Sequence, residues 1–178
     1  MYLSVEEPEV LGTAGGVANL QGWIEGRGTL TMNADAWHDA DLDHFVRGWD
    51  GERVRVLVAG SEFGPRACVV ASLLPWSEVE RLPTTPAGLY EASWRPAQQA
   101  GRLDVARHQG AFFDCGTPAG YLAANMAASD GRSVIGAGAH VDGSVDRSVV
   151  WPGAPVLRHE RMTSAIRASE HVTVLVRQ

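Results

Sequence analysis

The stretch from residue 129 to residue 156 restricts the fold more than any other part of this chain of 178 residues. It reads SDGRSVIGAGAHVDGSVDRSVVWPGAPV, and apolar residues recur in it about every six positions, with glycine and alanine between them. The apolar positions are Val134 or Ile135, Val141, Val145, Val149 with Val150, and Val156. This texture is typical of hexapeptide repeats that wind into a parallel β-helix. Because about three hexads make one turn, we expect little more than one turn, supported by the domain before it.

Residues 1–128 have a different pattern, in which short apolar runs alternate with helical segments. Alternation and β-branched residues predict strands at 2–5, 29–33, 53–60 and 67–76, and two strands separated by HQG within 101–116. Helical spacing and capping signals predict helices at 17–24, 40–51, 77–82 and 117–129, with Ser77 capping the third. The alternation predicts an α/β layer with a largely parallel sheet. In 161–178 we expect a helical turn and then a closing strand. The change of pattern at residue 129 predicts two domains, 1–128 and 129–178.

Two acidic residues follow predicted strands directly. Asp35 comes just after the strand that ends near Asn33, and Asp114 ends the strand FFD before a helix that starts at Thr117 and Pro118. In open α/β sheets, ligands bind outside the carboxyl ends of the strands. Carboxylates in that position, together with substrate phosphates, are typical Mg²⁺ ligands. The residues therefore favour a magnesium site at Asp35 and Asp114; the alternative is that they are helix caps or solvated loop acids.

Cys115 stands beside Asp114, and it raises the question of a nucleophile. A reactive cysteine needs a cationic partner or a helix N-terminus to become a thiolate, and no Cys–His pair is indicated. We interpret Cys115 as structural, and Cys115 and Cys68 as two reduced thiols of a cytosolic protein. The six histidines show no zinc-binding spacing.

The segment LGTAGG, Leu11 to Gly16, precedes a predicted helix. Glycine lets a ligand approach the main chain closely, and helix N-termini favour anions, so this loop is a candidate binding element. The alternative is a plain turn between a strand and a helix.

Charge and hydropathy exclude some classes of partner. The net charge is -6 and every basic residue is arginine, with no basic stripe for nucleic acid. No apolar run approaches the roughly 18 residues that a membrane-spanning helix needs. We therefore expect neither a nucleic-acid partner nor a membrane segment.

The motifs EEPEVLGTAGGVANL, NADAW, GLYEASW, FFDCGTPAGYLAANM and GSVDRSVVWPGAPV occur in this order. In this order and spacing the chain resembles sugar-phosphate nucleotidyltransferases, most closely the mannose-1-phosphate guanylyltransferase-like group with a C-terminal left-handed β-helix. The resemblance implies an α/β fold, namely an incomplete Rossmann-like sheet followed by a short left-handed parallel β-helix. It also implies a cytoplasmic enzyme that forms a nucleotide-sugar and pyrophosphate from a nucleoside triphosphate and a sugar 1-phosphate.

The same resemblance assigns roles to single residues. Asp35 and Asp114 would be the catalytic carboxylates that hold Mg²⁺. The implied substrate-binding residues are Leu11, Gly12 and Thr13 against the base, Gly15 for close approach, and Asn33 and Glu91. The β-helix would provide a surface for a homo-oligomer.

The chain departs from the family pattern at its phosphate-binding loop. The family signature, roughly G-x-G-T-R followed by P-L-T and P-K-P, is missing, and GRGTLTMN at Gly26 leads into the NAD strand instead. We therefore expect the chain to correspond to the C-terminal two-thirds of such an enzyme, with little or no turnover by itself. The alternative is a non-catalytic binding or assembly subunit that retains the scaffold.

Overall fold

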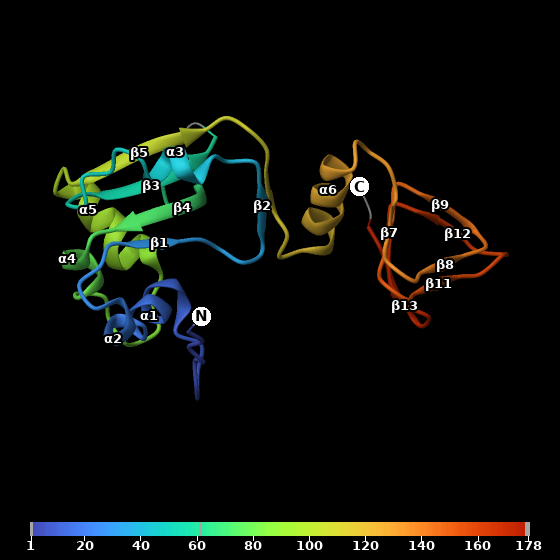
Figure 1. The fold of residues 1–178 in the computed structure, drawn as a ribbon, viewed down its shortest axis with the longest axis horizontal. Coiled ribbons are helices and arrows are strands. Elements are labelled where there is room, and N and C mark those ends of the chain that lie inside the picture. The colour runs from blue at the N-terminus through green and yellow to red at the C-terminus, as the bar shows by residue number, and fades with distance from the viewer. Residues whose placement is uncertain (1, 61, 177–178) are drawn as a thin grey trace. The chain divides into compact units, whose positions relative to one another are not determined.

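The computed structural model describes residues 2–60 and 62–176. The chain divides into two compact units. The first unit comprises Met1–Asn33 and Ala40–Gly110, and the second comprises Ala34–Asp39 and Ala111–Gln178. The short segment Ala34–Asp39 therefore leaves the first unit, contributes to the second, and returns (Figure 1). Among the described residues, no helix is both long and apolar enough to span a membrane.

The first unit contains a four-stranded sheet in the order β1-β4-β3-β5. Its strands are β1 (Thr29–Thr31), β3 (Val54–Ala59), β4 (Cys68–Leu74) and β5 (Leu103–His108). Only β3 and β5 pair in parallel, whereas β4 is antiparallel to both β1 and β3. The prediction of a largely parallel sheet is therefore wrong. The segment 60–67 between β3 and β4 is too short for the crossover that a parallel pair needs, so the two strands pair antiparallel.

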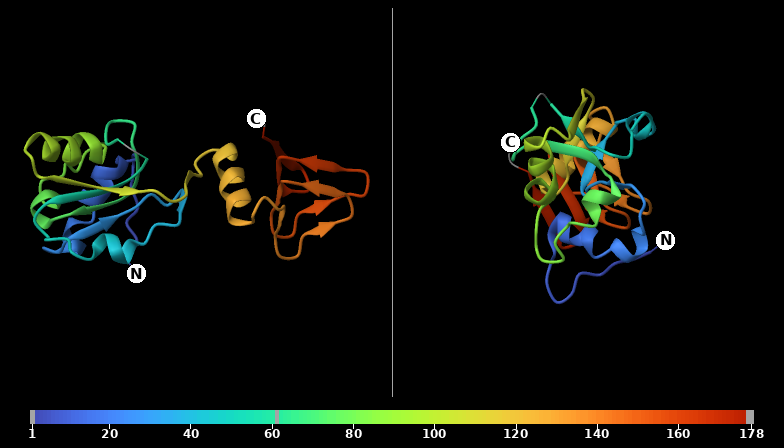
Figure 2. Two further views of the ribbon diagram at one scale, coloured as in Figure 1. Left: turned by 90° about the horizontal axis from the view of Figure 1, so that it is seen from above. Right: turned by 90° about the vertical axis from the view of Figure 1, so that its left-hand side faces the viewer.

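Short helices accompany this sheet. In the described part of the unit they are α1 (Gly12–Ala18), α2 (Gln21–Ile24), α3 (Leu42–Val46), α4 (Trp76–Val79), the π-helix η1 (Tyr90–Trp94) and α5 (Arg95–Gln99). Val54, Val56 and Val58 of β3 form the core with Ala14 of α1 and Ala97 of α5. Figure 2 shows α3 and α5 on opposite sides of the sheet.

Several local predictions in this unit need correction. Residues 2–10 form no strand; a strand needs a neighbour to pair with, and Leu3 and Val5 are exposed. The glycine-rich segment is not a turn before a helix, because α1 itself begins at Gly12. The helix expected over 40–51 is only α3, because the backbone of Arg47 is already extended and Gly48 follows with a φ of +79°. Helix α4 starts after Pro75 without a side-chain cap, so Ser77 does not cap it.

The second unit begins with a two-stranded antiparallel pair, β2 (Ala36–His38) and β6 (Phe112–Asp114), followed by α6 (Pro118–Ala128). The Thr117 hydroxyl accepts a hydrogen bond from the Gly120 N–H at 3.1 Å, with Pro118 in the first turn. The predicted cap and start of this helix are therefore confirmed. Leu122 of α6 packs against Val149 and Ile166 of the strands that follow.

Short strands complete the described part of the second unit: β7 (Val134–Ile135), β8 (His140–Val141), β9 (Ser144–Asp146), β10 (Val149–Val150), β11 (Pro155–Val156), β12 (Arg161–Thr163), β13 (Ala165–Ser169) and β14 (Val172–Leu175). Parallel ladders join β7 to β10 and β10 to β13, β8 to β11, and β9 to β12. Partner residues are 15 or 17 positions apart, close to the spacing of three hexads. The strands thus stack as successive turns of a coil, and Val150, Val156 and Met162 fill its interior.

The tail extends this coil further than the sequence predicts. Residues Arg161–Thr163, expected as a helical turn, form strand β12, which pairs with β9. Strand β13 then adds a third parallel strand beside β10, and β14 closes the sheet antiparallel to β13. The closing strand is confirmed, and parallel pairing extends beyond residues 129–156, for which little more than one turn was expected.

Candidate functional site

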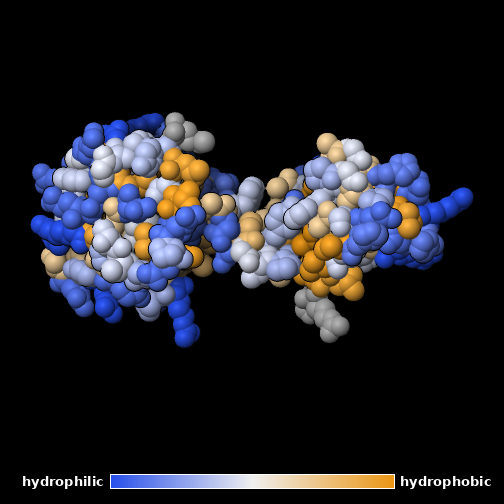
Figure 3. Space-filling model, turned by 90° about the horizontal axis from the view of Figure 1, so that it is seen from below, coloured by the Kyte–Doolittle hydropathy of each residue, from blue (hydrophilic) through white to orange (hydrophobic). Residues whose placement is uncertain are grey.

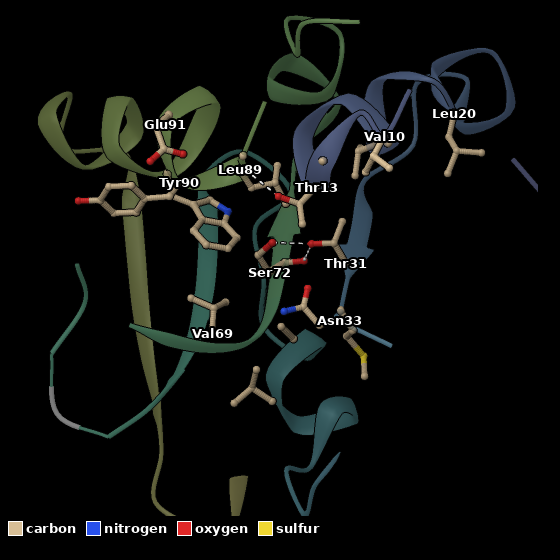
Figure 4. Close-up of a pocket in the computed structure, with 18 of the residues that line it drawn as sticks. Val10, Thr13, Leu20, Thr31, Asn33, Val69, Ser72, Leu89, Tyr90 and Glu91 are labelled. Atoms are coloured by element: carbon tan, nitrogen blue, oxygen red, sulfur yellow. Dashed lines mark hydrogen bonds between the residues drawn. The ribbon is translucent and has the colours of Figure 1, made fainter. Parts of the chain in front are cut away.

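A cavity of about 640 Å³ lies in the first unit. Its walls come from the N-terminal segment, α1, the residue before α2, β1, β4 and the turn that leads into η1. Figure 4 shows Thr13, Thr31, Asn33 and Ser72 gathered on one part of the wall. Apolar side chains, including Val69, line much of the rest. The size and the mixed lining are those of a small-molecule site.

Four of the residues assigned to substrate line this cavity: Gly12, Thr13, Asn33 and Glu91. Leu11 and Gly15 are not among its lining residues. A Cβ at Gly15 would lie 2.9 Å from the Thr85 carbonyl oxygen. The missing side chain of Gly15 therefore makes room for the chain's own turn, and its role toward a substrate stays a prediction.

Helix α1 is held to η1 through the turn that precedes η1. The Leu89 N–H donates to the Thr13 hydroxyl at 2.9 Å, and the Ala14 N–H donates to the Ala87 carbonyl at 2.9 Å. Gly12 has a φ of +70°, and a Cβ there would lie 2.8 Å from the Ala87 carbonyl oxygen. Position 12 of the LGTAG motif must therefore be glycine, because only glycine lets α1 start against this turn.

The π-helix η1 brings Tyr90, Glu91 and Trp94 to the cavity. π-Helical turns are rare and occur frequently at functional sites. The Trp94 indole Nε1 is buried and has no hydrogen-bond partner among the described residues. The sequence reasoning did not predict this helix, because a single π-turn has no periodicity of its own; GLYEASW was identified only through the resemblance.

A pair of hydroxyl groups lies on the β1–β4 side of the cavity. The Thr31 and Ser72 hydroxyl oxygens are 2.6 Å apart (Figure 4), and Ser72 is buried. Neither residue was predicted as a site residue. The signal was present but weak: Ser72 interrupts the otherwise apolar strand β4 with a polar side chain.

The two predicted metal carboxylates meet in the second unit. Asp114 ends β6 opposite Ala36 of β2, and the Cys115 N–H donates to the Asp35 carbonyl at 2.7 Å. A Cβ placed on Gly116 would lie 3.1 Å from Asp114 Oδ1 and 3.1 Å from Asp35 Oδ2. The two carboxylate oxygens therefore approach a common point beside Gly116. The structure brings these residues together although they are far apart in the sequence.

The surroundings of this pair fix its geometry. The Gly116 N–H donates to Asp114 Oδ1 at 2.9 Å, which orients that carboxylate. A Cβ at Gly120 would overlap the Asp114 carbonyl oxygen, so α6 can start against β6 only with glycine at this position. Within the described part of the chain, no group of three or more His, Cys, Asp or Glu side chains could hold a metal.

The Cys115 side chain contacts the main chain. Its Sγ is 3.7 Å from the Phe113 carbonyl oxygen, and the residue is half-buried. Cys68 is exposed, and both cysteines are free thiols. The geometry agrees with a structural Cys115.

Solved structures with a similar fold include sugar-phosphate nucleotidyltransferases. A mannose-1-phosphate geranyltransferase from Thermus thermophilus aligns with 96% of this chain and 73% of its own, with a TM-score of 0.63 and 14% identity. A candidate glucose-1-phosphate thymidylyltransferase from Bacillus anthracis, in complex with a sucrose, aligns with 67% of this chain and 61% of its own, at a TM-score of 0.56 and 14% identity. The UTP-bound UGPase from Acinetobacter baumannii aligns with 71% of this chain and 59% of its own, at a TM-score of 0.54 and 17% identity.

The fold of this chain is therefore that of the sugar-phosphate nucleotidyltransferases. The chain spans less than two-thirds of the length of the last two of these structures. Comparison of the sequence with models of protein families and with curated proteins finds no match.

Proposed function

We propose that this protein takes part in the transfer of a nucleotidyl group from a nucleoside triphosphate to a sugar 1-phosphate, which yields a nucleotide-sugar and pyrophosphate. The observation that carries this proposal is the approach of Asp35 and Asp114 to one point beside Gly116. The fold shared with enzymes of this chemistry supports it.

Asp35 and Asp114 fit a divalent cation. Two like charges that share one glycine-lined recess repel each other, and a cation between them removes that repulsion. Mg²⁺ is typically bound by one or two carboxylates, with substrate phosphates and water completing its shell, so a third protein ligand is not needed. When bound, the ion would neutralise charge on the phosphates. The chain's own contribution is to fix both carboxylates through the β2–β6 ladder and the Gly116 N–H.

The cavity of the first unit is the proposed place for the organic part of the substrate. Gly12 and Thr13, with Leu11, would face the base; Asn33 and Glu91 would contact the sugar. The support is that Gly12, Thr13, Asn33 and Glu91 line the same cavity. Gly15 keeps its proposed role only through its place in the motif.

The metal proposal is tested by titrating Mn²⁺, as a spectroscopic substitute for Mg²⁺, into the wild-type chain and into Asp35→Asn and Asp114→Asn. Each variant should weaken binding by about tenfold or more, because the remaining carboxylate has lost its partner charge. Cys115→Ser, beside one of the two ligands, and Asp130→Asn, an exposed acid elsewhere in the same unit, serve as matched controls and should bind like wild type. Equal binding by all of these proteins would show that the recess is not a metal site.

The same variants separate transfer from binding alone. We expect slow or no pyrophosphate release from GTP and mannose 1-phosphate with Mg²⁺, because the 178 residues contain neither a G-x-G-T-R loop nor any lysine. Robust turnover that Asp114→Asn abolishes would contradict this expectation and support full catalysis. Sugar 1-phosphate binding without turnover would favour the alternative, a binding or assembly subunit. The absence of arginine among the described residues lining the cavity is the observation that favours that alternative.

We further propose that the coil of β7 to β13 is a left-handed β-helix, and that it provides a contact between copies of the chain. The spacing of its ladders supports the first point. Figure 3 shows apolar side chains at the surface of both units, and Val172, Val174 and Leu175 of the edge strand β14 are exposed. Light scattering on the purified chain measures the oligomeric state, and a monomer at all concentrations would contradict the second point. The cytoplasmic location stays a prediction that rests on the cysteine content.

A further inference from the structure

The charge of the cavity in the first unit is unusual for a protein that handles phosphorylated ligands. Of the described residues that line it, only Glu6 and Glu91 carry a charge, and none is an arginine or a histidine. The chain has no lysine at all. The other polar groups on the wall are neutral, chiefly the hydroxyls of Thr13, Thr31 and Ser72. The cavity therefore presents negative charge and hydrogen-bonding oxygens to whatever enters it.

The two carboxylates differ in how far they are already engaged. Glu6 Oε2 accepts a hydrogen bond from the Leu11 N–H at 2.5 Å, so Glu6 ties the N-terminal segment to the start of α1. Glu91 has no hydrogen bond or ion pair with any described residue. Its Oε2 lies where a Cβ on Gly88 would come within 2.8 Å, so the carboxylate is folded over that glycine at the cavity wall (Figure 4). Of the two carboxylates, Glu91 is therefore the one that can accept hydrogen bonds from a ligand without losing one to the protein.

The physical consequence is a preference among ligands by charge. A carboxylate on the sugar would meet the like charge of Glu91, and no arginine or histidine among the described lining residues could pair with it. Neutral hydroxyls would find acceptors and donors. An ammonium group would gain a charge-assisted hydrogen bond to Glu91.

We propose that the sugar handled by this protein is an amino sugar, whose protonated amine binds Glu91, and that sugars bearing a carboxylate are rejected. This inference rests on the proposed function for the idea that the ligand is a sugar 1-phosphate. It adds the class of sugar and the residue that selects it.

The test is calorimetric titration of three sugar 1-phosphates that differ in one substituent, near neutral pH and with Mg²⁺ present. The probes are glucosamine 1-phosphate, glucose 1-phosphate and glucuronic acid 1-phosphate. We expect glucosamine 1-phosphate to bind roughly tenfold more tightly than glucose 1-phosphate, the size of effect of one hydrogen bond to a charged group. Glucuronic acid 1-phosphate should bind more weakly than both.

Glu91→Gln identifies the residue responsible. It keeps the shape and the hydrogen-bonding oxygen but removes the charge, so it should abolish the preference for glucosamine 1-phosphate over glucose 1-phosphate. Glu52→Gln, at an exposed acid outside the cavity, is the matched control and should retain the wild-type order.

The outcomes distinguish this inference from the proposed function. Equal binding of all three probes, or a preference that survives in Glu91→Gln, would overturn the inference and leave the proposed function standing. Tighter binding of glucuronic acid 1-phosphate would do the same. If none of the three probes binds, the inference and the sugar 1-phosphate assignment both fail.

Discussion

Glycines explain, at the scale of single residues, why the segment DCGTPAG has its particular sequence. Gly116 leaves the recess in which the Asp35 and Asp114 carboxylates meet. Gly120 lets α6 begin against the Asp114 carbonyl, and Thr117 caps the helix between them. Asp114 is thus placed by its neighbours on both sides. The same neighbours make Cys115 a connecting residue, whose N–H is used to hold Asp35.

Gly116→Ala tests this placement without removing a carboxylate. The added Cβ would lie 3.1 Å from an oxygen of each acid, tighter than nine in ten real Cβ contacts, so both carboxylates must shift away from it. We expect Mn²⁺ affinity to fall several-fold while the thermal unfolding temperature changes little, because the recess is exposed. Unchanged affinity in Gly116→Ala would mean that the two oxygens do not share a cation.

At the scale of elements, the sequence predicts a helix or strand correctly where neighbouring residues determine it. It fails where the structure depends on which strands pair with each other. The Thr117 cap and the apolar runs of β3 and β4 each depend on neighbouring residues, and each is found in the structure. The direction of β4 depends instead on the length of segment 60–67 and on which neighbour it pairs with. The π-helix η1 has no sequence period to detect. The cavity is lined by both β4 and η1, so only some of its lining residues were predicted.

The turn between β11 and β12 contains a charge contact that makes the coil sensitive to acid. The Leu157 N–H donates to Glu160 Oε2 at 2.6 Å, and the buried Arg167 pairs with Glu160 Oε1. The hydrogen bond from Leu157, followed by that from Arg167, lowers the pKa of Glu160. The Glu160 carboxylate therefore binds a proton more weakly in the folded state than in the unfolded chain. The resulting stability is present above the ordinary glutamate pKa and is lost as the pH falls through the lowered value.

We expect the unfolding temperature of the wild-type protein to fall as the pH is lowered below about 4.3, the ordinary glutamate pKa. Glu160→Gln should be less stable near neutral pH and should lose stability less steeply in acid. Glu170→Gln, at an exposed acid near the end of β13, is the control and should follow the wild-type curve. Thermal unfolding followed by circular dichroism across this pH range measures the effect. Parallel curves for Glu160→Gln and wild type would contradict the assignment.

For the molecule as a whole, stability is expected to be uneven between its elements. Strand β3 is flanked on both sides and is buried along most of its length, whereas the β2–β6 ladder has only two strands of three residues each. Amide hydrogens open more readily in elements with few buried contacts.

Hydrogen exchange measured by mass spectrometry should therefore show the slowest exchange in β3 and β4 and much faster exchange in β2 and β6. Saturating Mn²⁺ should slow exchange in β2 and β6 specifically, since a ligand that binds only the folded pair stabilises it. Added Mn²⁺ that protects β3 but not β6 would place the cation elsewhere.

The route of the chain through its two units also sets an order of events during synthesis. Ala36 is synthesised before the segment Ala40–Gly110, but its pairing partner Asp114 follows only after that whole segment has been made. Closing so long a loop is costly until the intervening residues have folded. We therefore expect the first unit to fold around an unpaired β2 segment, and the carboxylate pair to be assembled afterwards. The candidate metal site would then form only after the first unit has folded, while α6 and the strands that follow it are still being made.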